Sequence, residues 1–452
     1  MVRDIERRDF VKGVGAAGIV GLAGCTGDQS GGEGTTSGGS EGTTSGGSEG
    51  TTSGGSEGTS SGGSGGSVDR SEPIRYGVLL PTTGDLASVG KPIRDAATLV
   101  GKQLQNADMG GLSVEYREED TQTSPQAGIS AANSLVNAGI PGICGPASSG
   151  VNIQVSKQVF IPNGVVGCSP SSTAASVTDL EDDGFVFRTA PSDNLQGQVM
   201  GQVASENLGA SSAVTMYVNN DYGQGLSQSF ASAFEEAGGS VNDQVSFEKE
   251  QSSYTSKLQS ALGSDPDLLV VIGYPASGTQ MFKDFYSDFD PSNYDILLTD
   301  GMKDPEMRRQ VGNPMENVTG TAPAPVGPAA DAFASLYQEE YGRSPGVFNA
   351  HAYDASAILV LANAMAGEND GAAVKENMDK VANPEGTEVT VENLAEGVQM
   401  AAQGEDVNYQ GASSPTNFDD AGDMAAVSFD VWKFAPDTES GIEVSETIDF
   451  EK

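Results

Sequence analysis

The chain has 452 residues and a formal net charge of −40 at pH 7, from 63 acidic and 23 basic residues. Such a charge repels nucleic acid and anionic membrane surfaces, which excludes both as electrostatic partners. One histidine and three cysteines form no Cys/His cluster, so the sequence predicts no metal site.

The first 25 residues predict export and attachment to a membrane. Arg7 and Arg8 stand in the paired-arginine pattern of an export signal, and a weakly apolar stretch of about eleven residues follows, short of the ~20 that span a bilayer. Residues 22–25 look like a lipoprotein cleavage box. We therefore expect a twin-arginine signal peptide over residues 1–24, lipid on Cys25, and a location on the extracellular face of the cell membrane.

Residues 25–72 predict a tether. The unit Glu-Gly-Thr-Thr-Ser-Gly-Gly-Ser begins at Glu33, Glu41 and Glu49, and returns at Glu57 with one Thr replaced by Ser. It has no apolar residue to bury, so it cannot form a core, although its hydroxyls could carry O-glycans. A Gly/Ser coil of about 45 residues spans roughly 35–40 Å, which would hold a domain away from the membrane and let it turn.

From residue 74 onward, short apolar strands alternate with helices. The first run predicts strands at 74–81, 112–119, 140–144, 165–168 and 185–189, with helices at 89–106, 125–138 and 151–160. The second run predicts strands at 213–218, 241–247, 268–273, 296–299 and 318–322. This alternation is typical of right-handed βαβ units, so we expect an α/β fold with two doubly wound, parallel-sheet lobes.

The C-terminal third breaks the alternation. Helices are predicted at 329–341, 350–365, 372–381 and 391–403, followed by a turn cluster at 417–423 and a strand at 425–434. The chain is expected to cross back, close the first lobe and end in the second, giving a three-crossing hinge. The expected N-lobe comprises residues 73–191 with 326–415, and the expected C-lobe comprises residues 192–325 with 416–452.

Two cysteines remain once Cys25 is assigned to lipid. Cys144 and Cys168 each end a short apolar run. If the two runs are neighbouring parallel strands, the thiols could come within disulfide reach in an oxidising compartment. Two buried free thiols are the alternative, and export of an already folded chain from a reducing cytosol favours it.

Polar segments follow the predicted strands, at the edge where open α/β sheets bind ligands. In the first lobe, residues 145–150 and 169–173 offer hydroxyls and backbone N–H groups at helix starts, which suit a carboxylate. In the second lobe Tyr222, Tyr274 and Asp300 follow strands. A zwitterion whose ammonium meets Asp300 would bridge the lobes and draw the cleft shut. Helix caps, a packing tyrosine and a solvated acid are the plainer alternatives.

Over residues 74–434 these segments, in their order and spacing, resemble the periplasmic leucine/isoleucine/valine-binding proteins, the solute receptors of branched-chain amino-acid ABC transporters. The resemblance implies a type I periplasmic binding fold. The matching segments are 80–84, 145–150, 169–173, 221–225, 273–274, 300–301, 352–355 and 418–423.

The resemblance also implies roles for single residues. Ser149 and Thr173 look like carboxylate ligands, and Ser171 looks like a main-chain contact. Two tyrosines, Tyr222 and Tyr274, look like cleft walls.

Two further positions depart from the family pattern. Asp300 looks like the ammonium partner, where the best-known members have glutamate; its shorter side chain could accept a longer or bulkier ligand, or could reach the ligand through water. Val89 stands where some members place an aromatic that lines the side-chain pocket, which bears on branched-chain specificity.

The sequence thus predicts a monomeric, extracellular solute-binding lipoprotein. It would capture an amino acid or related small amide and deliver it to an ABC permease, with no cofactor and no catalytic nucleophile–base set. A sensor of the same fold that docks on a chemotaxis transducer is the alternative. The excess of acid over lysine resembles proteins of halophilic archaea and predicts a fold that weakens at low salt. Asn317-Val318-Thr319 matches an N-glycosylation sequon.

Overall fold

The computed structural model describes residues 70–451 except 383–384 and 439. The predicted signal peptide over residues 1–24, Cys25 and nearly all of the predicted tether lie outside the described residues. Within the described ranges, no helix is both long and apolar enough to cross a membrane.

The first sheet has five parallel strands in the order β2-β1-β3-β4-β5. Its central strands are short apolar runs because helices cover both of their faces. The edge strand β2 pairs from Ile74↔Val114 to Leu80↔Asp120 and carries mostly exposed acidic residues. The strands are β1 (Ile74–Leu80), β2 (Val114–Asp120), β3 (Gly142–Cys144), β4 (Val166–Ser169) and β5 (Val186–Arg188).

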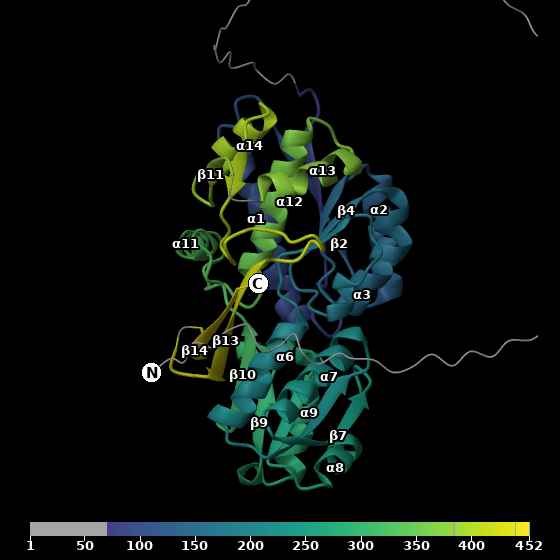
Figure 1. Cartoon of the computed structure of the whole chain (residues 1–452), viewed down its shortest axis with the longest axis vertical. Coiled ribbons are helices and arrows are strands. Elements are labelled where there is room, and N and C mark those ends of the chain that lie inside the picture. Colours follow the sequence, from purple (N-terminus) through teal and green to yellow (C-terminus); the bar gives the residue numbers. More distant parts are fainter. Residues whose placement is uncertain (1–69, 383–384, 439, 452) are drawn as a thin grey trace, which may run out of the picture. The chain divides into compact units, whose positions relative to one another are not determined.

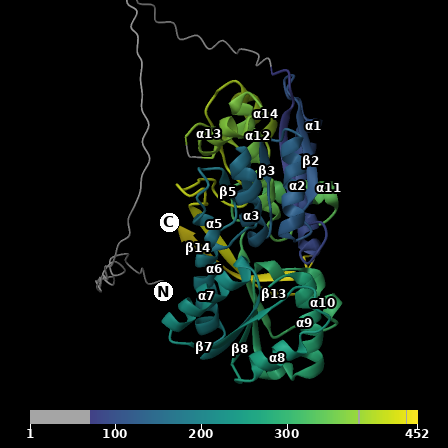
Figure 2. The ribbon, with the colours of Figure 1, turned by 90° about the vertical axis from the view of Figure 1, so that its right-hand side faces the viewer.

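Successive residues of β1 point to opposite faces of this sheet, as the two-residue period of a strand requires. Tyr76 and Val78 belong to the core shared with α1 and α12, whereas Leu79 packs with residues of α2 and α3. Figures 1 and 2 show these helices around the sheet. The helices are α1 (Ala87–Asn106), α2 (Pro125–Asn137), α3 (Ser149–Val155), α12 (Asn349–Ala366) and α13 (Gly371–Val381).

The second sheet has seven strands in the order β14-β13-β10-β9-β8-β6-β7. The five strands from β6 to β10 are parallel, and β13 and β14 add antiparallel at one edge. They are β6 (Ser212–Val218), β7 (Ser240–Phe247), β8 (Leu268–Ile272), β9 (Asp295–Leu298), β10 (Val318–Pro323), β13 (Ala426–Phe434) and β14 (Ile442–Glu451). The helices between β5 and α12 are α6 (Asp193–Gln202), α7 (Asp221–Glu236), α8 (Thr255–Leu262), α9 (Pro275–Asp288), α10 (Pro305–Val311) and α11 (Ala330–Tyr341).

The chain passes between the two sheets three times: after β5, after β10, and between β12 and β13. After the second passage α12 returns to pack on β1, β3 and β4. The prediction of two α/β lobes with mostly parallel sheets is therefore confirmed.

Some elements differ from the prediction. The predicted helix at 151–160 is α3 followed by a π-helical turn, Ser156–Phe160. A small parallel sheet of β11 (Thr387–Val389) and β12 (Val407–Tyr409) flanks α14 (Leu394–Ala402), and neither strand was predicted. The side-chain amide of Asn317 donates to the carbonyls of Pro291 and Tyr294, so the sequon asparagine is engaged inside the fold.

Of the two possibilities left open for Cys144 and Cys168, the structure has the two buried free thiols rather than a disulfide. Cys144 and Cys168 are register partners on β3 and β4, as the sequence suggested, but both are buried free thiols. Partners on parallel strands lie about 4.8 Å apart with side chains that point the same way, whereas a disulfide needs Cβ atoms turned toward each other and a dihedral near 90°. The Cys144 thiol instead donates to the carbonyl of Ala352 at 3.7 Å.

Two buried polar centres tie the third passage to the first lobe. The Arg188 guanidinium pairs with Asp423, with Nη2 donating to Oδ2 at 2.8 Å. The Asp354 carboxylate in α12 accepts from the Tyr409 hydroxyl at 2.7 Å and from the backbone N–H of Ala412 at 2.9 Å. These contacts give a structural role to Asp423 in the acidic turn at 417–423 and to Asp354 in the segment at 352–355.

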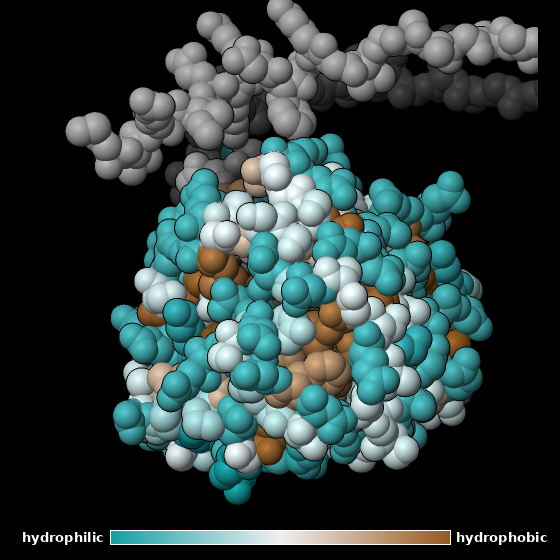
Figure 3. All heavy atoms as spheres, turned by 90° about the horizontal axis from the view of Figure 1, so that it is seen from below, coloured by the Kyte–Doolittle hydropathy of each residue, from teal (hydrophilic) through white to brown (hydrophobic). Residues whose placement is uncertain are grey.

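The surface is largely hydrophilic. Figure 3 shows the face seen from below, where hydrophilic residues surround a smaller apolar hollow. Among the described residues, Val326 and Val444 are the large hydrophobic side chains that stand most exposed, at 46% each.

Candidate functional site

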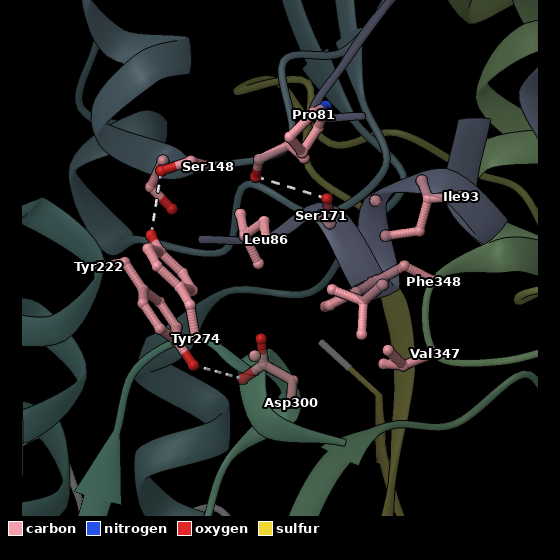
Figure 4. Close-up of a pocket in the computed structure, with 15 residues that line it drawn as sticks. Pro81, Leu86, Ile93, Ser148, Ser171, Tyr222, Tyr274, Asp300, Val347 and Phe348 are labelled. Carbon is pink, nitrogen blue, oxygen red and sulfur yellow. Dashed lines mark hydrogen bonds between the residues drawn. The ribbon is translucent and has the colours of Figure 1, made fainter. Parts of the chain in front are cut away.

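A pocket lies between the two lobes, beyond the carboxyl ends of β1, β3 and β4, where open α/β sheets bind ligands (Figure 4). Its volume is about 20 Å³, which leaves room for water rather than for an amino acid. A ligand can therefore enter only when the lobes part or the lining side chains move. The lining residues are Pro81, Leu86, Val89, Gly90, Ile93, Ala147, Ser148, Ser149, Ser171, Tyr222, Tyr274, Asp300, Gly301, Val347 and Phe348.

Two tyrosines form one wall of the pocket, and the hydroxyl of each makes hydrogen bonds. The rings of Tyr222 and Tyr274 stack with centroids 5.8 Å apart and planes 9° from parallel. Tyr222 donates to Oδ1 of Asp300 at 3.0 Å and lies 2.7 Å from the Thr299 hydroxyl. The Tyr274 hydroxyl meets Ser148 of the first lobe at 3.0 Å, so this wall also links the two lobes.

Asp300 follows β9 and is buried, with 3% of its surface exposed. Burial raises the pKa of its carboxyl to about 6, and the hydrogen bond from Tyr222 opposes that rise. No ion-pair partner stands beside it among the described residues. A buried carboxylate without a cation is the arrangement that an incoming ammonium group would relieve.

A second buried carboxylate stands near Asp300 and was missed by sequence reasoning. Asp193 begins α6 and is 1% exposed, and the Thr173 side chain lies beside its carboxyl group. Burial, together with the negative charge of Asp300, raises its pKa well above the usual range. In the sequence, Ser192-Asp193 resembles any capped helix start, so no local pattern marks it as part of a site.

The predicted hydroxyls of the first lobe occupy different positions. Ser149 is buried, and its Oγ accepts from the backbone N–H of Ala174 at 3.2 Å. Ser171 is partly exposed, lines the pocket and donates to the carbonyl of Ala147 at 3.4 Å. Thr173 is buried, its side chain lies beside the Asp193 carboxyl group, and it does not line the pocket.

The structure thus brings six of the seven predicted ligand residues around one pocket and leaves Thr173 outside its lining. Contact between these residues and a ligand stays a prediction.

The remaining wall is apolar. Val89, predicted from the sequence, is joined there by Leu86 and Ile93 of the first lobe. Phe348 closes this wall from the start of α12 and was not predicted; its φ of +61° is uncommon for a residue other than glycine. A hydrocarbon group that reached this wall would meet apolar side chains and no polar partner from them.

Within the described ranges, no group of three or more His, Cys, Asp and Glu side chains is placed to hold a metal ion. His351 is buried in α12, where burial and the nearby charge of Lys303 lower its pKa to about 3. It is therefore a neutral side chain of the interior at ordinary pH.

The sequence matches the family model described as "Periplasmic binding protein" over residues 73–430. Among curated proteins it is similar to the chemotactic signal transduction system substrate-binding protein BasB of Halobacterium salinarum, with 25% identity over 76% of this chain and 82% of that protein. It is also similar to the leucine-, isoleucine-, valine-, threonine- and alanine-binding protein of Pseudomonas aeruginosa, with 24% identity over 68% of this chain and 82% of that protein.

Solved structures agree on the fold. The leucine-binding protein LivK of Thermotoga maritima superposes with a TM-score of 0.69 and 26% identity, covering 83% of this chain and 98% of that one. LivJ of Streptococcus pneumoniae, in complex with isoleucine, gives a TM-score of 0.67 at 22% identity, over 84% of this chain and 100% of that one. The predicted type I periplasmic binding fold and the resemblance to branched-chain amino-acid binding proteins are confirmed.

Proposed function

Because this chain belongs to the periplasmic binding protein family, we propose that it captures an amino acid, of the branched-chain type or a related small amide, and delivers it to an ABC permease. Relatives in this family bind solutes and are not enzymes, which supports a binding role without turnover.

The observation that carries the proposal is the buried Asp300 carboxylate on the pocket wall. It has an aromatic hydroxyl as hydrogen-bond donor and a second carboxylate, Asp193, nearby. A ligand ammonium group would neutralise Asp300 and remove part of its repulsion with Asp193. This assigns the ammonium end of the ligand to the second lobe.

The opposite side of the pocket suits the other ends of such a ligand. Ser149 and Ser171, with the backbone N–H groups of their turns, would receive the carboxylate or amide oxygen. The apolar wall that includes Val89 and Phe348 would receive a hydrocarbon side chain. The ligand would therefore touch both lobes.

A ligand that touches both lobes stabilises their closed arrangement, because only a difference in affinity between two states can shift the population. With a volume of about 20 Å³, the pocket is a closed cleft with little spare space. The closed form is then the form presented to the permease.

The tether and the predicted domain boundaries belong to the same proposal. Lipid on Cys25, export by the twin-arginine route and a monomeric state would place a single binding unit outside the cell, held near its membrane partner. The N-lobe would comprise 73–191 with 326–415, and the C-lobe 192–325 with 416–452.

A thermal-shift screen in molar KCl, with single amino acids, urea and short amides, tests the proposal. We expect the melting temperature to rise with one or more amino acids, and calorimetry to give one bound molecule per chain that is recovered unchanged. A screen in which only ligands without an ammonium or amide group stabilise the protein would contradict it.

The similarity to BasB favours a second candidate function, that of a ligand-binding sensor which docks on a chemotaxis transducer. A deletion strain separates the two. Loss of amino-acid uptake with intact chemotaxis supports transport, whereas loss of attraction to the ligand with intact uptake supports sensing.

A further inference from the structure

A group of contacts between the lobes lies outside the pocket lining. Asp85, in the loop between β1 and α1, is 1% exposed and reaches the start of α9 on the other lobe. Its Oδ1 accepts from the backbone N–H of Ser277 at 2.8 Å, and its Oδ2 accepts from the Ser277 hydroxyl at 2.8 Å. A carboxylate of one lobe thus caps a helix of the other.

A second contact stands beside the first. The ammonium of Lys249, in the loop after β7, donates to the backbone carbonyl of Thr123 at 2.6 Å. The next residue, Glu250, donates its backbone N–H to the Ser277 hydroxyl at 3.1 Å. The two contacts are therefore connected within the second lobe.

The loops that carry these contacts are held in unusual conformations. Gln122 and Thr123 both have φ of +53°, and Glu250 has φ of +56°. A left-handed conformation is a genuine outlier for a β-branched residue such as Thr123. Hydrogen bonds to the Asp120 side chain hold this turn of the first lobe in place. One of them comes from the backbone N–H of Gln122, which donates to Oδ1 of Asp120 at 2.8 Å. Backbone outliers of this kind persist where the surrounding structure imposes them, commonly at functional positions.

We propose that Asp85, Ser277, Lys249 and Thr123 form a clasp that holds the two lobes closed and sets ligand affinity from outside the pocket. None of the four lines the pocket, but Asp85 is next to Leu86, and Ser277 is three residues after Tyr274. This inference deepens the proposed function. The clasp stabilises the closed form whether or not ligand is present, so it raises the affinity for every ligand by the same factor.

The distance between the lobes in the ligand-free, full-length protein tests the clasp without reference to any ligand. Spin labels on Lys157→Cys and Lys257→Cys, exposed positions of the first and second lobe, report it in a Cys25→Ser background in molar KCl. Asp85→Ala leaves two donors of Ser277 without an acceptor when the lobes close. We expect the ratio of closed to open molecules to fall by about tenfold or more, as for a lost hydrogen bond to a charged group.

Two further variants separate the clasp from misfolding. Ser277→Ala removes the hydroxyl and keeps Asp85, and it should lower the closed fraction by less than Asp85→Ala does. Glu235→Gln changes an exposed side chain of α7 that takes no part in the clasp, and it should leave the distances unchanged. Distance distributions that are the same in wild type and Asp85→Ala, with unchanged circular dichroism, would overturn the proposal.

Isoleucine titrations distinguish this proposal from the proposed function. If isoleucine binds, Asp85→Ala should weaken its affinity by the same factor by which the closed fraction of the ligand-free protein falls. Failure of isoleucine to bind the wild type would count against the proposed ligand class, while the spin-label distances would still decide whether the clasp exists.

Titration of Asp85 gives an independent reading. Burial raises the pKa of Asp85, whereas its hydrogen bonds to Ser277 and the positive charge of Lys249 lower it. The other titratable groups that face Asp85 are Glu250, Tyr254 and Tyr274. A pKa that is higher in the closed form means that closing takes up a proton, so closure is favoured as pH falls. The Asp85→Asn variant keeps one acceptor oxygen for Ser277. We expect this variant to remain closed and to lose the pH dependence of closure that comes from Asp85.

Discussion

Asp300 is the residue that the resemblance assigns to the ligand ammonium group, and the structure shows what surrounds it. Tyr222 donates to it, and Asp193 places a second buried carboxyl group nearby. Burial and mutual repulsion make both carboxylates costly without a cation. Ligand binding would release that cost, which gives the second lobe a reason to close on an ammonium group.

Replacing Asp300 with asparagine keeps its shape and removes its charge. We expect amino-acid affinity to fall by about 2 kcal/mol or more, roughly 30-fold, because a buried ammonium loses its ionic partner. Calorimetry with the tightest ligand of the screen measures this. Asp295→Asn, at the exposed start of β9, is the matched control, and wild-type affinity in Asp300→Asn would refute the assignment.

Ligand affinity should also depend on pH through Asp300. Its pKa is about 6 in the free protein, and a bound ammonium would lower that value. Affinity should therefore be full above pH 6 and fall by up to tenfold per pH unit below it, with a proton released on binding. Calorimetry in two buffers of different ionisation enthalpy detects the proton, and a flat profile from pH 7 to pH 5 would contradict the prediction.

The sequence predicted the site residues that directly follow strands. It did not predict the residues that come near the pocket only through the arrangement of the two lobes. Tyr222, Tyr274 and Asp300 come after β6, β8 and β9, and the chemistry of strand ends marks them. Asp193 and Phe348 lie at the first and second passages between sheets, where no periodic pattern signals a ligand. Their place in the site follows from folding of the hinge rather than from local sequence.

At the scale of elements, the passages between the lobes depend on buried polar centres rather than on apolar packing alone. Arg188 ends β5, and Asp423 ends the acidic turn before β13. Removing one member of such a pair leaves the other charge buried and uncompensated. The pair thus fixes where the third passage starts relative to the first lobe.

The Asp423→Asn variant tests this anchor. We expect it to lose about 3–5 kcal/mol of unfolding free energy, because Arg188 would remain buried without its carboxylate. Denaturant unfolding at constant molar KCl measures the loss. Asp420→Asn, three residues earlier and exposed, should change stability by less than 1 kcal/mol, and equal effects of the two substitutions would argue against the anchor.

The alternation of strands and helices was predictable because most of the buried strands are short and predominantly apolar. The strands β11 and β12, three residues each, are too short to show a period. The ten-residue strand β14 was missed because acidic residues interrupt it and it lies at the sheet edge. A register shift between Val431 and Trp432, together with those charges, is typical of an edge protected from pairing with other chains.

At the scale of the whole molecule, 63 acidic residues against 23 basic ones leave most carboxylates without a cationic partner. Their repulsion acts over the Debye length, about 10 Å at 0.1 M salt and about 3 Å at 1 M. The folded state concentrates these charges more than the unfolded chain does. Salt should therefore act chiefly on the folded state.

We expect the melting temperature to rise steadily between dilute and molar KCl. Differential scanning calorimetry at fixed pH measures it, and an equal osmolality of sucrose serves as a control for effects that do not depend on charge. A melting temperature that stays constant across the KCl series would remove charge repulsion as a determinant of stability.

The chain has one tryptophan, and its location makes it an optical probe of one half of the molecule. Trp432 is fully buried in β13 of the second sheet, with its ring edge-on to Phe434 at 5.2 Å. Its fluorescence during denaturation will follow the second lobe, whereas circular dichroism follows both. Two curves that coincide would mean that the lobes unfold as one cooperative unit, and any separation between them would measure how independent they are.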